Sequence, residues 1–144
     1  MKKNILLVLI LIACVVAVSG CLQWLFPQVP PQPKETPIIH AVSTLVGDTY
    51  QITISSISNP TTAAAVRYVV KDATGAIVRS GYLFDIYSKE VDGVMFKDNN
   101  ADGKISADDI FFIKSETAGG PGQAGGNFVL IYIVTNNMMM SMTL

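Results

Sequence analysis

Thr49-Tyr50-Gln51-Ile52-Thr53-Ile54-Ser55 carries an apolar side chain at every second position. This period is typical of a β-strand with one buried side and one side in water, because successive side chains of a strand point to opposite faces. Residues 66–71, Val-Arg-Tyr-Val-Val-Lys, follow nearly the same pattern. Both stretches therefore predict strands rather than helices.

The segments that follow predict hairpins. Asp72-Ala73-Thr74-Gly75 has the composition of a turn and leads into a predicted strand at 77–84. Residues 128–135 are apolar on both faces, which predicts an interior strand. Asn136-Asn137 suits a tight turn, because asparagine tolerates a positive φ, and a last strand is expected at 138–143.

Three more stretches, 38–46, 91–96 and 110–114, bring the count to seven or eight strands. Turn signals at this spacing predict an all-β fold, an immunoglobulin-like antiparallel β-sandwich or a related closed sheet. The chain has 144 residues, which leaves room for one domain beside a targeting segment. We therefore place a single folded domain at residues 38–144.

The N-terminus has the features of a signal peptide. Lys2 and Lys3 precede an uninterrupted apolar run of 14 residues, Ile5–Val18. A transmembrane helix needs about 20 apolar residues, whereas a secretory signal uses about 7 to 15. Val18-Ser19-Gly20-Cys21 resembles the lipobox of prokaryotic lipoproteins, which implies removal of a helical signal peptide, residues 1–20, and lipidation of Cys21. The alternative is an uncleaved signal anchor.

Residues 21–37 are predicted to join this anchor to the folded domain. Five prolines occur between Pro27 and Pro37, and proline favours extended polyproline II over helix or sheet interior. We expect either a stalk that holds the domain off the membrane or a disordered tether without a required length. The predicted location is extracytoplasmic, on the cell surface. Cys14 and Cys21 are the two cysteines of the chain, so processing would leave no disulfide.

Composition argues against two classes of function. Ten basic and eleven acidic residues give a formal charge of −1, and this becomes 8 − 11 = −3 without Lys2 and Lys3. Nucleic-acid binding needs a basic patch, so we expect none. The single histidine, His40, is expected on a strand surface, and no cysteine nucleophile remains after processing. We predict that the protein is not an enzyme.

Residues 98–109 fit the twelve-residue calcium loop of EF-hands. Side-chain oxygens fall at positions 1, 3 and 5, Gly103 stands at position 6 and Ile105 at the apolar position 8. Ca²⁺ prefers six to eight hard oxygen ligands, which such alternating short side chains can supply. The predicted ligands, with Lys104 acting through its carbonyl, are Asp98, Asn100, Asp102, Lys104, Ser106 and Asp109.

Two details shape this prediction. Asp109 replaces the usual glutamate at position 12, and its shorter arm predicts modest affinity. Residues 110–113, Ile-Phe-Phe-Ile, have no polar face, which favours a strand after the loop over the helix of an EF-hand. Calcium would then be structural. The loop with its flanks, residues 96–109, resembles that of secreted archaeal β-domains, including archaeal type IV pilin-like proteins, although a lipobox replaces the prepilin cleavage site.

Two other segments are candidate ligand-binding or metal-binding sites. Residues 119–126 are rich in glycine but lack the lysine-serine ending of a phosphate loop, which predicts a flexible connection that could serve as a binding loop. Met138, Met140 and Met142 would share one face of a strand and pack in the core. The alternative for these thioethers is a copper(I) site.

The sequence leaves several non-catalytic functions open. The first is a calcium-stabilised surface module for adhesion, envelope structure or binding of an envelope protein or glycan. The second is a substrate-capturing lipoprotein of a transport or envelope assembly, which would need a pocket between the sheets. A pilin-like or dockerin-like assembly module is a third, although the second loop repeat of a dockerin is missing.

Overall fold

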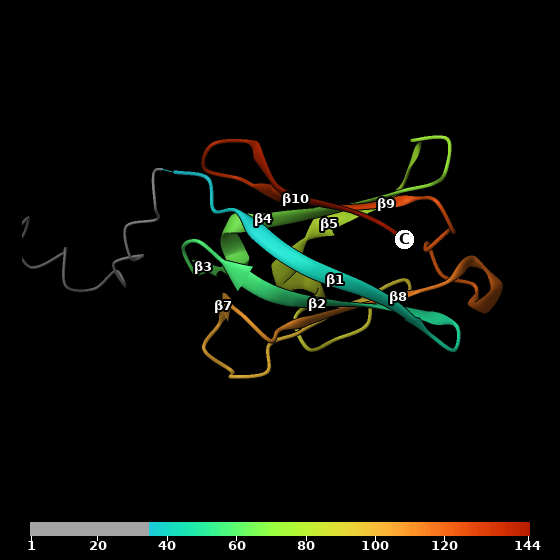
Figure 1. Ribbon diagram of the computed structural model, residues 1–144, viewed down its shortest axis with the longest axis horizontal. Coiled ribbons are helices and arrows are strands. Elements are labelled where there is room, and N and C mark those ends of the chain that lie inside the picture. The colour runs from blue at the N-terminus through green and yellow to red at the C-terminus, as the bar shows by residue number, and fades with distance from the viewer. Residues whose placement is uncertain (1–34) are drawn as a thin grey trace, which may run out of the picture. The chain divides into compact units, whose positions relative to one another are not determined.

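A computed structural model describes residues 35–144 of the chain. The predicted signal peptide, the lipidation site Cys21 and the stalk up to residue 34 lie outside the described residues. The described part is all-β, and its two main sheets face each other as a sandwich (Figure 1). The predicted fold class is confirmed.

Each main sheet has four antiparallel strands. The first has the order β1 (Ile39–Val46), β2 (Thr49–Ile57), β8 (Ile110–Lys114), β6 (Val94–Lys97). The second has the order β10 (Asn137–Thr143), β9 (Asn127–Tyr132), β4 (Val66–Lys71), β5 (Ile77–Tyr82). In immunoglobulin letters these orders are A-B-E-D and G-F-C-C′, which is the arrangement of that sandwich.

Two short strands raise the total within residues 35–144 to ten, above the predicted seven or eight. They are β3 (Thr61–Thr62) and β7 (Lys104–Ile105), which pair with each other in a separate ladder. Strands of two residues carry no periodic signal, so the sequence could not reveal them. Three 3₁₀ turns complete the fold, namely η2 (Ala63–Ala65), η3 (Leu83–Ile86) and η4 (Glu116–Ala118). No helix within residues 35–144 is long and apolar enough to span a membrane.

The core fills the space between the sheets. The inward residues of β2, Ile52 and Ile54, are fully buried, as the alternating sequence predicts. Phe111 of β8 lies with its ring centre 4.8 Å from that of Phe96 in the same sheet and 5.0 Å from that of Phe128 in the facing sheet. Because residues 39–144 supply this whole core, we expect them to fold without the first 34 residues.

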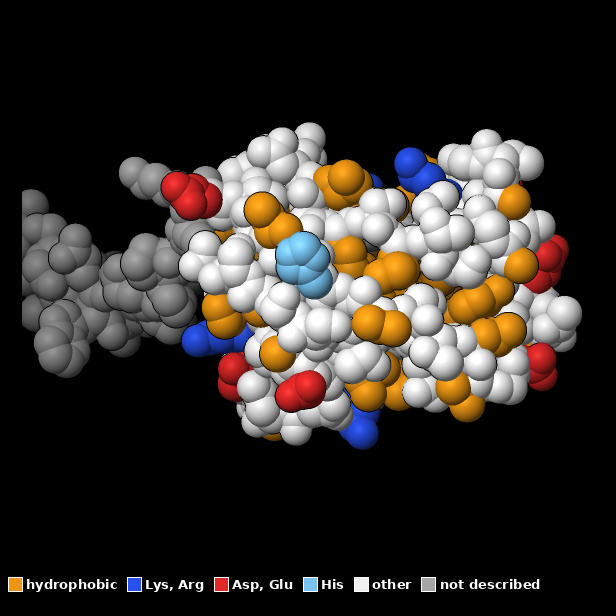
Figure 2. All heavy atoms as spheres, viewed as in Figure 1, with side chains coloured by type: hydrophobic (Ala, Val, Ile, Leu, Met, Phe, Trp, Pro, Cys, Tyr) orange, Lys and Arg blue, Asp and Glu red, His pale blue; other side chains and the backbone are white. Residues whose placement is uncertain are grey.

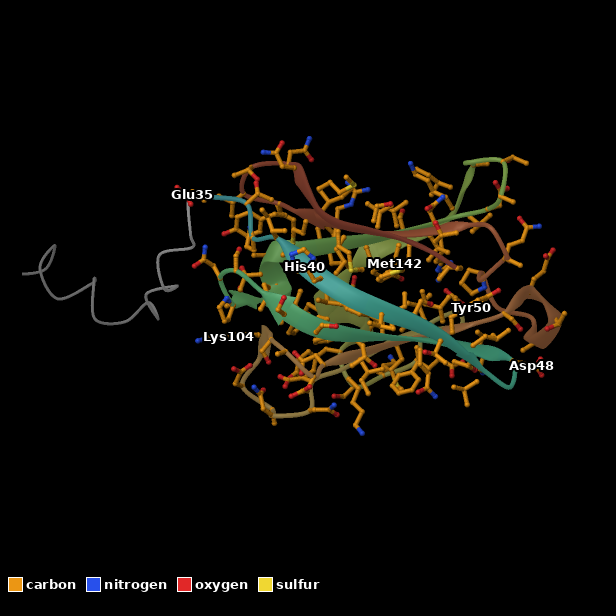
Figure 3. All side chains as sticks on the ribbon, viewed as in Figure 1. Glu35, His40, Asp48, Tyr50, Lys104 and Met142 are labelled. Atoms are coloured by element: carbon orange, nitrogen blue, oxygen red, sulfur yellow. The ribbon has the colours of Figure 1, made fainter. Side chains whose placement is uncertain are left out.

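The sandwich has two distinct ends. We call the end where the described chain begins the entry end. There Thr36 is hydrogen-bonded to Thr135 of the β9–β10 turn and to Asn137, the first residue of β10. The 98–109 loop lies at this end, and Glu35 and Lys104 mark it in Figure 3. The far end carries the β1–β2 turn with Asp48 and the loop between β8 and β9.

The methionines of β10 do not follow simple alternation. The register with β9 shifts between Met138 and Met140, so that Met139 forms a bulge. Met138 is 61% exposed, whereas Met139 and Met140 are both buried. The prediction that Met138, Met140 and Met142 share one core face is therefore wrong, and the copper hypothesis loses its geometric basis. Because the bulge adds one residue, the side chain of Met138 points to the face opposite to the one that simple alternation predicts.

Candidate functional site

The 98–109 loop connects two strands of the first sheet. β6 pairs antiparallel with β8 from Val94 opposite Ile113 to Lys97 opposite Ile110. The strand-loop-strand prediction is confirmed, and β8 takes the place of the helix that follows an EF-hand loop. Alternate residues of β8, Phe111 and Ile113, are buried, which fixes this strand in the core.

Asp98 organises the first half of the loop. Its side chain is buried, with 9% exposure, and accepts four hydrogen bonds. Oδ1 accepts the backbone N–H groups of Asn100 at 3.1 Å and Ala101 at 2.7 Å. Oδ2 accepts the N–H of Gly103 at 2.8 Å and the hydroxyl of Tyr87. Gly103 has a φ of +74°, so glycine is the residue that adopts this turn without strain.

Asp109 organises the second half. It is fully buried at 0% exposure. Oδ1 accepts the N–H of Asn99 at 3.0 Å, and Oδ2 accepts both the N–H of Ser106 at 2.7 Å and its hydroxyl at 3.1 Å. Hydrogen bonds to Asp109 therefore join the two ends of this half of the loop.

The two buried carboxylates have shifted pKa values. Burial raises the pKa of Asp109, hydrogen bonds from Asn99 and Ser106 oppose the shift, and the charge of Asp98 adds to it. Burial also acts to raise the pKa of Asp98, but the hydrogen bonds from Tyr87 and three backbone N–H groups outweigh it and hold the pKa below its usual range. The Asp98 hydrogen bond in turn raises the pKa of Tyr87.

Within the described residues, no basic side chain forms an ion pair with these two carboxylates. Within residues 35–144 the ion pairs are Arg79 with Asp92 and Lys114 with Glu90, and neither involves the loop. Buried charges in proteins are usually paired or coordinate a metal, because an isolated buried charge is costly. Asp98 and Asp109 thus form a buried, electrostatically coupled pair that only hydrogen-bond donors stabilise.

The other predicted ligands are partly gathered around this pair. Asn100 donates from Nδ2 to Ser106 Oγ at 3.0 Å, which joins both side chains to Asp109. Asp102 lies exposed at the outer surface and accepts the N–H of Lys104 at 2.8 Å. In the part of the chain that the structure describes, no three Asp, Glu, His or Cys side chains converge as metal ligands.

The loop is fastened to the sandwich by β7. Ile105 is fully buried and lies opposite Thr61 of β3, so the apolar residue at position 8 is a core residue. Gly103 accepts the N–H of Ala63 of η2 through its carbonyl at 3.2 Å. Loop geometry and core packing are therefore linked at this end.

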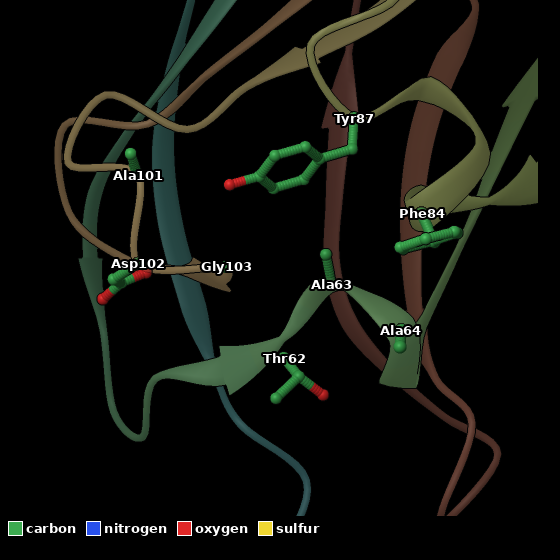
Figure 4. A pocket seen from close by; sticks show the side chains of 8 residues that line it. All are labelled: Thr62, Ala63, Ala64, Phe84, Tyr87, Ala101, Asp102 and Gly103. Atoms are coloured by element: carbon green, nitrogen blue, oxygen red, sulfur yellow. The ribbon is translucent and has the colours of Figure 1, made fainter.

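Tyr87 is a residue of this site that the sequence did not indicate. It follows η3, 11 positions before Asp98, and no motif contains it. Tyr87 also lines a hollow of about 460 Å³ with Phe84, Ala101 and Asp102, shown in Figure 4. One wall of this hollow is the loop itself.

No known protein family matches the chain, and no curated protein is similar to it in sequence.

Proposed function

We propose that the protein is a non-catalytic, lipid-anchored module of the cell surface, whose β-sandwich is stabilised by calcium and binds an envelope partner. The observation that carries the proposal is the pair of buried carboxylates, Asp98 and Asp109, without a basic partner. A bound divalent cation would supply the missing positive charge at this place.

The residues present fit calcium in their chemistry. The donors are carboxylate, amide, hydroxyl and carbonyl oxygens, which are the ligands that Ca²⁺ prefers. Asp98, Asn100, Ser106 and Asp109 already lie in one hydrogen-bonded group, and Asp102 and the carbonyl of Lys104 would complete the set. The ion would offset the repulsion between the carboxylates and hold the connection between β6 and β8.

Partner binding is favoured over capture of a small substrate between the sheets. Most inward side chains of β2, β8 and β9 are fully buried, and the hollow beside Tyr87 lies at the entry end of the sandwich. His40 is exposed on β1, where Figure 2 shows its pale blue side chain on the surface. The filled interior supports a module that presents its surface loops to an envelope protein or glycan.

Calcium is expected to raise the melting temperature of residues 35–144. A ligand that binds only the folded state stabilises it by about 2.7 kcal/mol at a free concentration of about 100 times Kd. For a domain of this size that equals a shift of roughly 10 °C. Differential scanning calorimetry in calcium and in chelator measures the shift, and titration calorimetry measures the binding heat.

A pair of variants in the same loop sharpens this test. Asp102→Ala removes an exposed predicted ligand and should abolish most of the calcium shift. Asp108→Asn removes an equally exposed charge outside the predicted ligand set and should retain it, and asparagine tolerates the φ of +71° at this position. Equal calcium responses in both variants, or no binding heat in the original domain, would remove calcium from the proposal.

The anchor has a test of its own. Cys21→Ser in the full chain is expected to abolish lipid labelling and to leave an unprocessed precursor or release the protein, because the serine hydroxyl does not replace the thiol as lipid acceptor. Metabolic labelling with a lipid precursor and membrane fractionation measure both effects. Unchanged processing and labelling would contradict a lipid anchor at Cys21.

A further inference from the structure

A second hollow lies at the far end of the sandwich, opposite the calcium loop. It has a volume of about 470 Å³ and lies between the β1–β2 turn and the loop after β8. We infer that this hollow binds a lysine or arginine side chain of a protein partner. The inference rests on the proposed function only in that the domain acts by binding, and it does not require calcium. The residues that line it include Leu45, Asp48, Tyr50, Glu116, Thr117 and Gln123.

Backbone hydrogen bonds and close contacts hold the loop that forms one wall of the hollow. The carbonyl of Gly122 accepts the N–H of Glu116 at 2.7 Å, and its N–H donates to the carbonyl of Lys114 at 2.9 Å. A Cβ at Gly120 would lie 2.3 Å from Lys114 O, and one at Gly122 would lie 2.9 Å from the same atom and from the Tyr50 ring. These glycines allow close backbone approach, so the wall is preorganised.

Tyr50 supplies a polar group without a partner. Its side chain lines the hollow and is 7% exposed, and its hydroxyl makes no hydrogen bond within residues 35–144. Within residues 35–144, Arg79 Nε is the one side-chain nitrogen or oxygen that is both inaccessible to solvent and without a hydrogen-bond partner. Because the Tyr50 hydroxyl also lacks a partner but is not such an atom, it is open to solvent. A buried tyrosine usually hydrogen-bonds through its hydroxyl, which makes this group a ready acceptor or donor for a ligand.

The charges of the hollow select a cation. Asp48 and Glu116 line it and belong to no ion pair within residues 35–144, and no lysine or arginine of this part of the chain lines it. They accept long hydrogen bonds from uncharged donors, from the Thr117 hydroxyl to Asp48 at 3.4 Å and from Gln123 Nε2 to Glu116 at 3.3 Å. An anionic ligand would be repelled, and a basic group would meet two carboxylates that no basic side chain of the described residues neutralises.

The apolar part of the lining fits the stem of such a side chain. Leu45 is exposed beside the hollow, and the Tyr50 ring forms part of its lining. Lysine and arginine bury their methylene stems against apolar surface while the charged head meets polar groups. The hollow offers an apolar wall, two carboxylates and a hydroxyl, which match the two parts of a basic side chain.

The experiment uses residues 35–144 and a capped pentapeptide with one arginine between alanines. Its control is the same peptide with citrulline, which has nearly the same shape and no charge. Binding is followed by amide chemical shifts, with and without calcium. Saturable shifts in residues 115–124 are expected, with about tenfold weaker binding of the citrulline peptide.

Single substitutions test how much each residue contributes to arginine binding. Asp48→Asn and Glu116→Gln should each weaken arginine binding about three- to fivefold, as expected for one solvent-exposed charge pair. Tyr50→Phe should weaken it about threefold at an unchanged melting temperature, because the hydroxyl has no partner to lose. Asp85→Asn, an exposed carboxylate of η3 away from this hollow, should change nothing.

Three outcomes would overturn the inference. The first is equal binding of the arginine and citrulline peptides, and the second is a set of shifts away from residues 115–124. The third is saturation of the hollow by a neutral disaccharide such as maltose without binding of the arginine peptide, which would assign it to a glycan. Because binding is measured in chelator as well, failure here is separate from failure of the calcium site.

Discussion

Replacing Asp98 with alanine is expected to lower the free energy of unfolding by about 3 kcal/mol, even in chelator. The substitution removes the acceptor of four donors, namely the Tyr87 hydroxyl and the backbone N–H groups of Asn100, Ala101 and Gly103. Each buried donor left without a partner costs about 1–3 kcal/mol, and water can satisfy those near the loop surface. Urea denaturation with an unchanged m-value would measure the loss.

The matched control is Asp102→Ala in the same loop. Asp102 is exposed and accepts one backbone N–H, so the expected loss in chelator is within about 0.5 kcal/mol. Equal losses in the two variants would contradict the organising role of Asp98. Comparing both variants in calcium then separates the hydrogen-bonding role of the loop from its proposed role as a metal site.

Replacing Phe111 with alanine is expected to lower the free energy of unfolding by about 4 kcal/mol. Its ring lies between those of Phe96 and Phe128, with centre distances of 4.8 Å and 5.0 Å, and it is fully buried. The cavity would lie where the two sheets meet, and neighbours held in strands can collapse into it only in part. Chemical denaturation of residues 35–144 measures the effect.

The neighbouring residue provides the control for the Phe111 variant. Phe112 lies next on β8 and is only half-buried, because its side chain points to the opposite face. Phe112→Ala should cost at most about 1.5 kcal/mol. A larger loss at Phe112 than at Phe111 would mean that β8 pairs one residue out of the described register, which would turn each of its side chains to the other face.

Much of the sandwich could be predicted because its strands are long enough to show alternation. The eight strands of the two main sheets correspond to the eight predicted stretches. The sequence predicts two strand ends too far along the chain, because residues 83–86 form η3 and the strand expected at 128–135 ends at Tyr132. Apolar composition continues past both ends, so the sequence carries no signal for the change in backbone conformation.

The sequence could predict the candidate site only where its residues lie close together along the chain. Spacing within residues 98–109 identified Asp98, Gly103 and Asp109, and the loop does close through these residues. Tyr87 and the β3–β7 ladder reach the site through contacts between segments that are distant along the chain. No local sequence pattern shows which residues make such contacts. The glycines after β8 were ambiguous for a related reason, because glycine serves both flexibility and close packing.

The strand at the edge of the first sheet has a mechanical consequence. β1 begins beside the point where the chain enters the sandwich and pairs with β2 from Ile39 opposite Ile57 to Val46 opposite Thr49. Antiparallel hydrogen bonds run perpendicular to their strands. A pull on an N-terminal tether, resisted by a partner at the far end, would therefore load this ladder in shear, with its bonds sharing the force at once. In the proposed surface module, β1 would therefore resist such a force as a mechanical clamp.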